Sequence, residues 1–170
     1  MPIRAYGLFW RAHEVDWSPG RGNRDRFRLL GRVGLNRPGL QVADFRDQRG
    51  LYVLYGEYGP YYVGLTRKVG IGNRLKNHRS DIHRGKWDRF SWFGFRRVLK
   101  RPDRSGLQPL AGLATVEMGN QNEIIGDMEA LLIAALGCQS NLNKMSFRQA
   151  REWTQVRDEE AEAYLEKLAR

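Results

Sequence analysis

Two short runs of apolar and aromatic residues, separated by a polar turn, give the clearest pattern along the chain. Residues 50–56 (GLYVLYG) and 61–65 (YYVGL) are rich in Tyr, Val and Leu, which favour β-strands. The residues between them include Gly59 and Pro60, which are typical of turns. Pro60 fits a turn or a strand start because no ladder hydrogen bond is lost there. The pattern therefore predicts a β-hairpin.

Residues 70–83 follow with the spacing of a helix. Ile71, Leu75 and Ile82 fall on one stripe at helical periodicity. The largely aromatic run at 88–98 predicts a third strand.

A second helix is predicted over 121–136, and Gly137 is a natural C-cap for it. Residues 156–169 predict a terminal helix with acidic residues early and a lysine late, as the helix dipole prefers. The apolar arc of the 121–136 helix consists of Ile124, Ile125, Met128, Leu131, Leu132, Ala135 and Leu136.

The remaining patterns are weaker. Residues 5–10 and 111–118 read as short strands, 18–26 as a loop and 27–39 as a strand with a turn. The strongest elements run strand, strand, helix, strand, helix. This order predicts an α/β (α+β) fold in which helices pack on a small sheet.

Charge adds the first indication of a partner. The 170 residues fit one domain with extensions and carry a net charge of +10. Residues 1–110 hold 23 Lys and Arg against 9 acids, whereas residues 111–170 hold 6 against 10. A basic half interleaved with aromatic residues favours nucleic acid as the partner. The alternative explanation of the basic charge is a GC-rich genome whose codon usage drifted toward arginine.

Other classes of protein are disfavoured. Cys138 is the only cysteine, so neither an internal disulfide nor a cysteine-based zinc site can form. No run approaches the roughly 20 apolar residues that span a bilayer, so we expect no membrane association. The first 17 residues lack the uninterrupted apolar stretch of a secretory signal, which predicts a cytoplasmic protein.

Candidate chemistry comes from the two predicted helices. Arg74 and His78 are four residues apart and share a helix face, where the helix should meet the tyrosine strands. Glu129 lies at the edge of its helix's apolar arc, whereas Glu123 and Asp127 fall on the opposite, solvated face. A carboxylate beside apolar surface needs a partner, either an arginine or a divalent cation. Tyrosine, arginine, histidine and glutamate on a basic fold suit phosphodiester hydrolysis, provided that positive charge lowers the pKa of a tyrosine.

In this set and its order, the sequence resembles the GIY-YIG nuclease family. Gly50-Leu51-Tyr52 matches the first motif and Tyr62-Val63-Gly64 the second, with one apolar residue replacing another at each middle position. The other matches are Arg74 with His78 one turn later, Glu129 on the later helix, and a closing asparagine. Asn143 is preferred for that asparagine and Asn141 competes with it.

The resemblance implies a three-stranded antiparallel sheet flanked by helices, with the nuclease core over 48–146. Residues 1–47 would form a basic N-terminal extension packed on this core, and 147–170 a C-terminal helical extension. It also implies one Mg²⁺ (or Mn²⁺) bound through Glu129, Tyr62 or His78 as the base, and Arg74 as the phosphate clamp. Tyr52 would be a second phenol that shapes the site.

The implied activity is an endonuclease that leaves 5′-phosphate and 3′-hydroxyl ends. We expect DNA as the substrate, with RNA-directed or toxin nucleases and a non-catalytic nucleic-acid-binding module as alternatives, and a homodimer as a further possibility. The basic residues expected to contact nucleic acid are Arg67, Lys68, Lys76, Arg79, Lys100 and Arg101.

Overall fold

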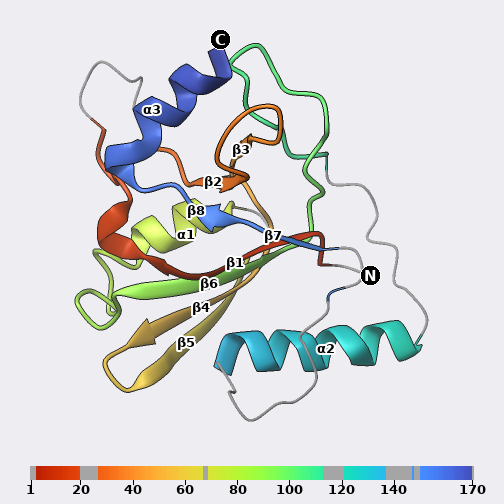
Figure 1. Cartoon of the computed structure of the whole chain (residues 1–170). Coiled ribbons are helices and arrows are strands. Elements are labelled where there is room, and N and C mark those ends of the chain that lie inside the picture. Colours follow the sequence, from red (N-terminus) through yellow and green to blue (C-terminus); the bar gives the residue numbers. More distant parts are fainter. Residues whose placement is uncertain are drawn as a thin grey trace.

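The residues that the computed structural model describes form two β-sheets and three α-helices (Figure 1). The structure describes residues 3–19, 27–66, 69–112, 121–136, 147 and 150–169. Within the 121–136 helix, side chains are described from Asp127 onward, except that of Glu129. The mixed α/β class predicted from the sequence is confirmed.

The larger sheet has five strands in the order β5-β4-β6-β1-β7. The predicted hairpin is β4 (Gly50–Gly56) and β5 (Gly59–Thr66), and β4 also pairs antiparallel with β6 (Arg89–Gly94). The expectation of a three-stranded sheet is wrong, because β1 (Ala5–Arg11) pairs antiparallel with the other edge of β6. The short β7 (Arg151–Glu152) then adds in parallel to β1. β1 thus satisfies backbone groups that β6 would otherwise leave open, and β7 pairs with part of the outer edge of β1.

The smaller sheet has the order β3-β2-β8 and uses both ends of the chain as well. Its strands are β2 (Leu30–Val33), β3 (Gln41–Asp44) and β8 (Thr154–Gln155). Helix α3 (Asp158–Ala169) covers it through Tyr164, which is buried with Leu30 and Val42. The short 3₁₀ helix η1 (Ala12–Glu14) follows β1.

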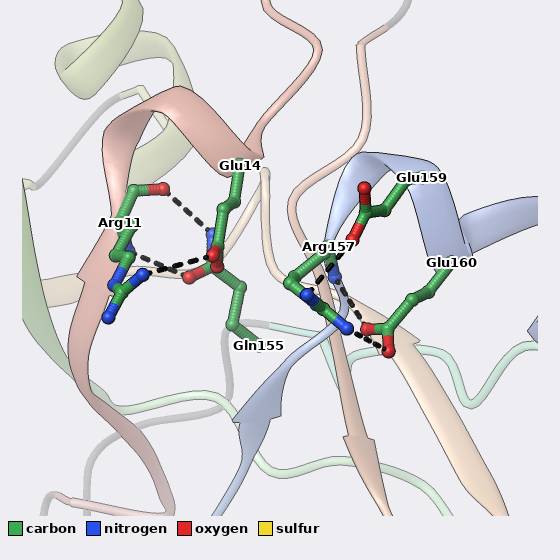
Figure 2. A network of polar contacts seen from close by, with 6 residues as sticks. All are labelled: Arg11, Glu14, Gln155, Arg157, Glu159 and Glu160. Carbon is green, nitrogen blue, oxygen red and sulfur yellow. Dashed lines mark hydrogen bonds and ion pairs between the residues drawn. The ribbon is translucent and has the colours of Figure 1, made fainter.

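Polar contacts join the end of β1 to β8, and a second group of contacts lies at the start of α3 (Figure 2). The Gln155 side chain accepts from the Arg11 backbone N–H at 2.7 Å and donates to the Arg11 carbonyl at 2.9 Å. Arg157, just before α3, pairs with Glu159 at 2.9 Å and Glu160 at 2.7 Å. Arg11 and Gln155, which are 144 positions apart in the sequence, are therefore held side by side.

Helix α1 (Ile71–Asn77) is shorter than the predicted 70–83. Ile71 and Leu75 are buried as expected, but Ile82 lies beyond the helix and is 78% exposed, so its place on the stripe is wrong. The helix ends because local hydrogen bonds replace its ladder: the Ser80 and Asp81 backbone N–H groups both donate to the Asn77 carbonyl. Serine and aspartate favour such turns over helix interiors.

Helix α2 (Gln121–Leu136) has the predicted bounds but a different buried face. Ala130, Ala134 and Ala135 pack against the sheet with Val53 and Phe93. Of the predicted apolar arc, Ala135 is buried and Leu131 packs against this cluster, whereas Met128 (60%), Leu132 (54%) and Leu136 (57%) are exposed. The prediction that Asp127 faces solvent is wrong, because Asp127 is buried. The small alanines allow the helix backbone to approach the sheet closely, which the larger side chains would prevent.

The other predicted elements differ mainly at their ends. The third strand stops at Gly94 rather than at residue 98. In the predicted strand at 111–118, residues 111–112 are not in a strand and the others lie outside the described residues. Among the described residues, no helix combines the length and apolar character needed to cross a membrane.

Candidate functional site

Tyr52 and Tyr62 lie on one face of the larger sheet, the face that α1 covers. In the β4/β5 register Tyr52 pairs with Gly64 and Leu54 pairs with Tyr62, so the two tyrosines are diagonal neighbours. Their ring centroids are 6.2 Å apart. Gly64 is required here because a Cβ at that position would overlap the Tyr52 hydroxyl. The glycine of the second motif thus makes room for the tyrosine of the first.

His78 joins the tyrosines from the end of α1. Its Nε2 lies 2.7 Å from the Tyr52 hydroxyl, and its Nδ1 lies 2.7 Å from Asp81 Oδ2. A carboxylate only accepts hydrogen bonds, so Nδ1 carries the proton and Nε2 accepts from Tyr52. The result is a hydrogen-bonded chain, Tyr52–His78–Asp81, in which Tyr52 (0% exposed) and His78 (2%) are buried.

Burial sets the charge state of this chain. It lowers the pKa of His78, and this effect outweighs the opposing influence of Asp81. Desolvation alone would raise the pKa of Asp81, but hydrogen bonds from the His83 backbone N–H and the His78 side chain hold it below its usual value. Near neutral pH, His78 is therefore a neutral imidazole beside an ionised carboxylate.

Arg74 supplies the positive charge of the site. Its pKa is raised, first by its polar contact with the Tyr52 hydroxyl and then by Tyr62. The expectation that positive charge would lower a tyrosine pKa is wrong for Tyr52. Burial raises the pKa of this phenol and outweighs the lowering influence of Arg74. Tyr52 therefore stays protonated, as a hydrogen-bond donor to His78.

His83 completes the cluster from the turn that follows α1. Its ring centroid lies 4.7 Å from that of His78 and 4.5 Å from that of Tyr62. Ligand atoms of His78, Asp81 and His83 all lie within 4.8 Å of one another, so this group could hold a metal ion. Two imidazoles and a carboxylate suit Zn²⁺ and similar ions, whereas Mg²⁺ prefers oxygen ligands alone.

Glu129 and the closing asparagine of the predicted site are not among the described side chains of this cluster. Helix α2 carries Glu129 on the sheet face opposite α1, and the Glu129 side chain, like Asn143 and Asn141, lies outside the described residues. Within the described part of the chain, Asp81 is the carboxylate whose charge acts on His78. The donors present at the cluster therefore do not fit Mg²⁺.

Of the six predicted nucleic-acid-binding residues, two belong to α1 or the turn after it. Lys76 and Arg79 lie on and just after α1, with their cationic groups over the rings of Phe27 (5.1 Å) and Trp17 (5.4 Å). Lys100 and Arg101 are exposed in the segment after β6, and Arg67 and Lys68 lie outside the described residues. Residues 71–89 together hold six Lys and Arg against two acids.

Asp81 and His83 were missed by the sequence-based analysis. The signal was the spacing His78-x-x-Asp81-x-His83, which places three possible metal ligands in six residues. A helix continued to residue 83 would keep His78 and Asp81 on one face but turn His83 away from them, so the prediction of a long helix concealed the cluster. The turn that ends α1 brings them together.

Comparisons of the chain with family models, with curated proteins and with solved structures found no match.

Proposed function

We propose that this protein is a phosphodiesterase, a GIY-YIG-type endonuclease that cuts nucleic acid, with DNA as its expected substrate. The observation that supports the proposal best is the convergence of Tyr52, Tyr62, Arg74 and His78. These four residues come from three elements and meet on one sheet face. The strands β4, β5 and β6 with α1 would be the nuclease core, in a cytoplasmic protein.

Arg74 is the group for the phosphate. Its guanidinium lies against two phenols, and because its pKa is raised it stays charged at every accessible pH. A fixed positive charge stabilises the charge that develops on the phosphoryl oxygens as the water oxygen attacks. Arginine can also bind two phosphate oxygens at once, which orients the scissile bond.

Tyr62 is the better candidate for the base. His78 is buried, and both of its ring nitrogens are already engaged by Tyr52 and Asp81. Tyr62 is only half-buried and lies beside Arg74, so its phenol can meet both solvent and positive charge. In this scheme Tyr62 acts as the phenolate and takes the proton of the attacking water, which returns it to the neutral phenol. The Tyr52–His78–Asp81 chain is a positioning device that holds Arg74 and Tyr62 in place.

The resemblance also implies a divalent ion bound through Glu129, but α2 carries Glu129 on the sheet face opposite this cluster, so no step of the scheme is assigned to that ion. The proposed products carry 3′-hydroxyl and 5′-phosphate ends. The steps above use only groups at the described cluster. A homodimer would bring two such sites to one duplex.

Digestion of single-stranded DNA, duplex DNA and RNA with Mg²⁺ or Mn²⁺ tests the proposal. Arg74→Ala should reduce cleavage about 10²- to 10³-fold, the usual effect of losing one group that stabilises the transition state. Arg151→Ala is the control, because it removes the same charge from an exposed position on β7, at the far edge of the sheet from β5. Cleavage by Arg74→Ala at the wild-type rate would refute the assignment.

One observation favours a second candidate, a nucleic-acid-binding module without activity. Tyr52 and His78 direct their polar atoms at each other rather than at solvent. Salt-sensitive binding without cleavage of any substrate in the panel would support this candidate.

A further inference from the structure

The turn after α1 carries polar side chains that the proposed phosphate site does not use. Residues 78–83 (HRSDIH) place two imidazoles and a carboxylate on one side of a single turn. The scheme above uses Asp81 only to orient His78 and gives His83 no role. These two residues and His78 therefore call for a separate explanation.

The three side chains are already held for a common ligand. Asp81 is fixed from both sides, because its Oδ1 accepts from the His83 backbone N–H at 2.8 Å and its Oδ2 contacts His78. The His83 ring is oriented by the Tyr61 hydroxyl, 3.2 Å from Nδ1, and by the face of Tyr62. Metal-binding histidines commonly have such a hydrogen-bond partner, which fixes the ring for ligation.

The ring planes of His78 and His83 stand at 89° to each other, with centroids 4.7 Å apart. They are not stacked, and their ligand atoms and that of Asp81 lie within 4.8 Å of one another. Three ligands of this kind, with one position left open, are typical of zinc sites. His78 is buried, Asp81 is exposed and His83 is intermediate, so the group also has a solvent-facing side through which an ion can enter.

We propose that His78, Asp81 and His83 form a binding site for Zn²⁺ or a chemically similar transition-metal ion. This site is distinct from the Mg²⁺ expected at Glu129. Its ligands are imidazole nitrogens and one carboxylate oxygen, so millimolar Mg²⁺ does not compete for it.

Occupancy of this site changes the neighbouring tyrosine contact. An ion on His78 Nδ1 requires the imidazole proton to sit on Nε2, with no net gain or loss of protons. Nε2 then donates to Tyr52 instead of accepting from it. The consequence for activity rests on the proposed function: the ion should inhibit cleavage, because the chain that positions Arg74 and Tyr62 is reorganised.

Titration of the tag-free chain with Zn²⁺ by calorimetry, and with Co²⁺ by visible absorption, tests the site. All variants carry Cys138→Ser, so that the lone thiol cannot bind the ion. We expect one ion per chain, retained in excess Mg²⁺. His83→Asn and Asp81→Asn should each weaken binding at least about 10- to 100-fold, since losing even a second-shell partner costs that much.

His13→Asn is the matched control, because His13 is the third histidine of the chain and is exposed in η1. Circular dichroism and thermal melts establish that each variant is folded. Absence of Zn²⁺ binding by the folded wild-type chain would overturn the site. Unchanged binding in both His83→Asn and Asp81→Asn would also overturn it.

Cleavage assays separate this proposal from the proposed function. Zn²⁺ should inhibit the wild-type chain and should not inhibit His83→Asn at the same concentration. Zn²⁺ binding that fails to inhibit cleavage would refute the coupling to Tyr52 but support the site. Zn²⁺ binding by a chain that cleaves no substrate would refute the nuclease and still support the site.

Discussion

Replacing Tyr52 with phenylalanine tests the hydrogen-bonded chain at its centre. The substitution keeps the ring, which is fully buried against α1, and removes only the hydroxyl that donates to His78 Nε2 at 2.7 Å. His78 Nε2 is then left buried without its partner. The cost of such a group is about 1–3 kcal/mol. At about 2–4 °C per kcal/mol for a chain of this size, the melting temperature should fall by about 2–12 °C.

Tyr55→Phe is the matched control on the opposite face of the same strand. Tyr55 is 3% exposed, and its hydroxyl donates to the Ala135 carbonyl at the same distance, 2.7 Å. Both variants should therefore lose similar stability. Only Tyr52→Phe should also lose cleavage, by about 10²-fold in kcat, the size expected when a reacting group is misplaced by about 1 Å.

Thermal melts and single-turnover cleavage of both variants provide the measurement. Heteronuclear NMR of the ring nitrogens adds a direct readout, because His78 Nε2 should be unprotonated and hydrogen-bonded in the wild type and should shift in Tyr52→Phe. Equal cleavage by Tyr52→Phe and Tyr55→Phe would show that the Tyr52–His78 hydrogen bond has no role in cleavage. An unchanged melting temperature in Tyr52→Phe would show that no such hydrogen bond forms.

Three further predictions concern Gly64 and Arg74 at the site and Tyr6 on the opposite face of the sheet. Gly64→Ala should cost about 1–3 kcal/mol by overpacking against the Tyr52 ring, whereas Gly112→Ala, whose Cβ would meet open space, should be neutral in chemical denaturation; equal effects would contradict the role given to Gly64. Arg74→Lys should recover only part of the activity lost in Arg74→Ala, because an ammonium group cannot bind two oxygens as a fork; full recovery would show that charge alone is needed. Burial and Glu152 raise the pKa of Tyr6 to about 12. Because Tyr6 holds its proton more tightly in the folded state, it stabilises the fold below its unfolded pKa, and this contribution is lost as pH rises toward the folded pKa. Unfolding free energy should thus fall by at most about 1.4 kcal/mol per pH unit between pH 10 and 12, and Tyr6→Phe should remove that part of the slope in alkaline melts.

The local elements near the site follow from short-range sequence patterns. Alternating Tyr, Val and Leu on both sides of a short turn predict the β4/β5 hairpin, because turn geometry and strand preference act within a few residues. The turn itself is Glu57-Tyr58, and the predicted turn residues Gly59 and Pro60 begin β5. The diagonal placement of Tyr52 and Tyr62 then follows from the hairpin register. The contacts of Ile71 and Leu75 bring Arg74 and His78 to the same face by helical spacing.

The tertiary structure decided the features that depend on distant partners. Ala5 pairs with both Gly94 and Arg151, and no local pattern specifies contacts across such separations. Helical periodicity shows which residues of α2 share a face. It does not show which face docks, and close packing on the sheet selected the small alanines over Met128 and Leu132.

The grouping of His78, Asp81 and His83 has the same origin. The sequence by itself sets their spacing, but the end of α1 at Asn77 determined that His83 joins His78 and Asp81 rather than turning away along a helix. That end depends on Asn77 accepting hydrogen bonds from the following turn, and on His78 being buried beside Tyr52. A buried imidazole must find partners for both of its nitrogens, and only the folded chain supplies them.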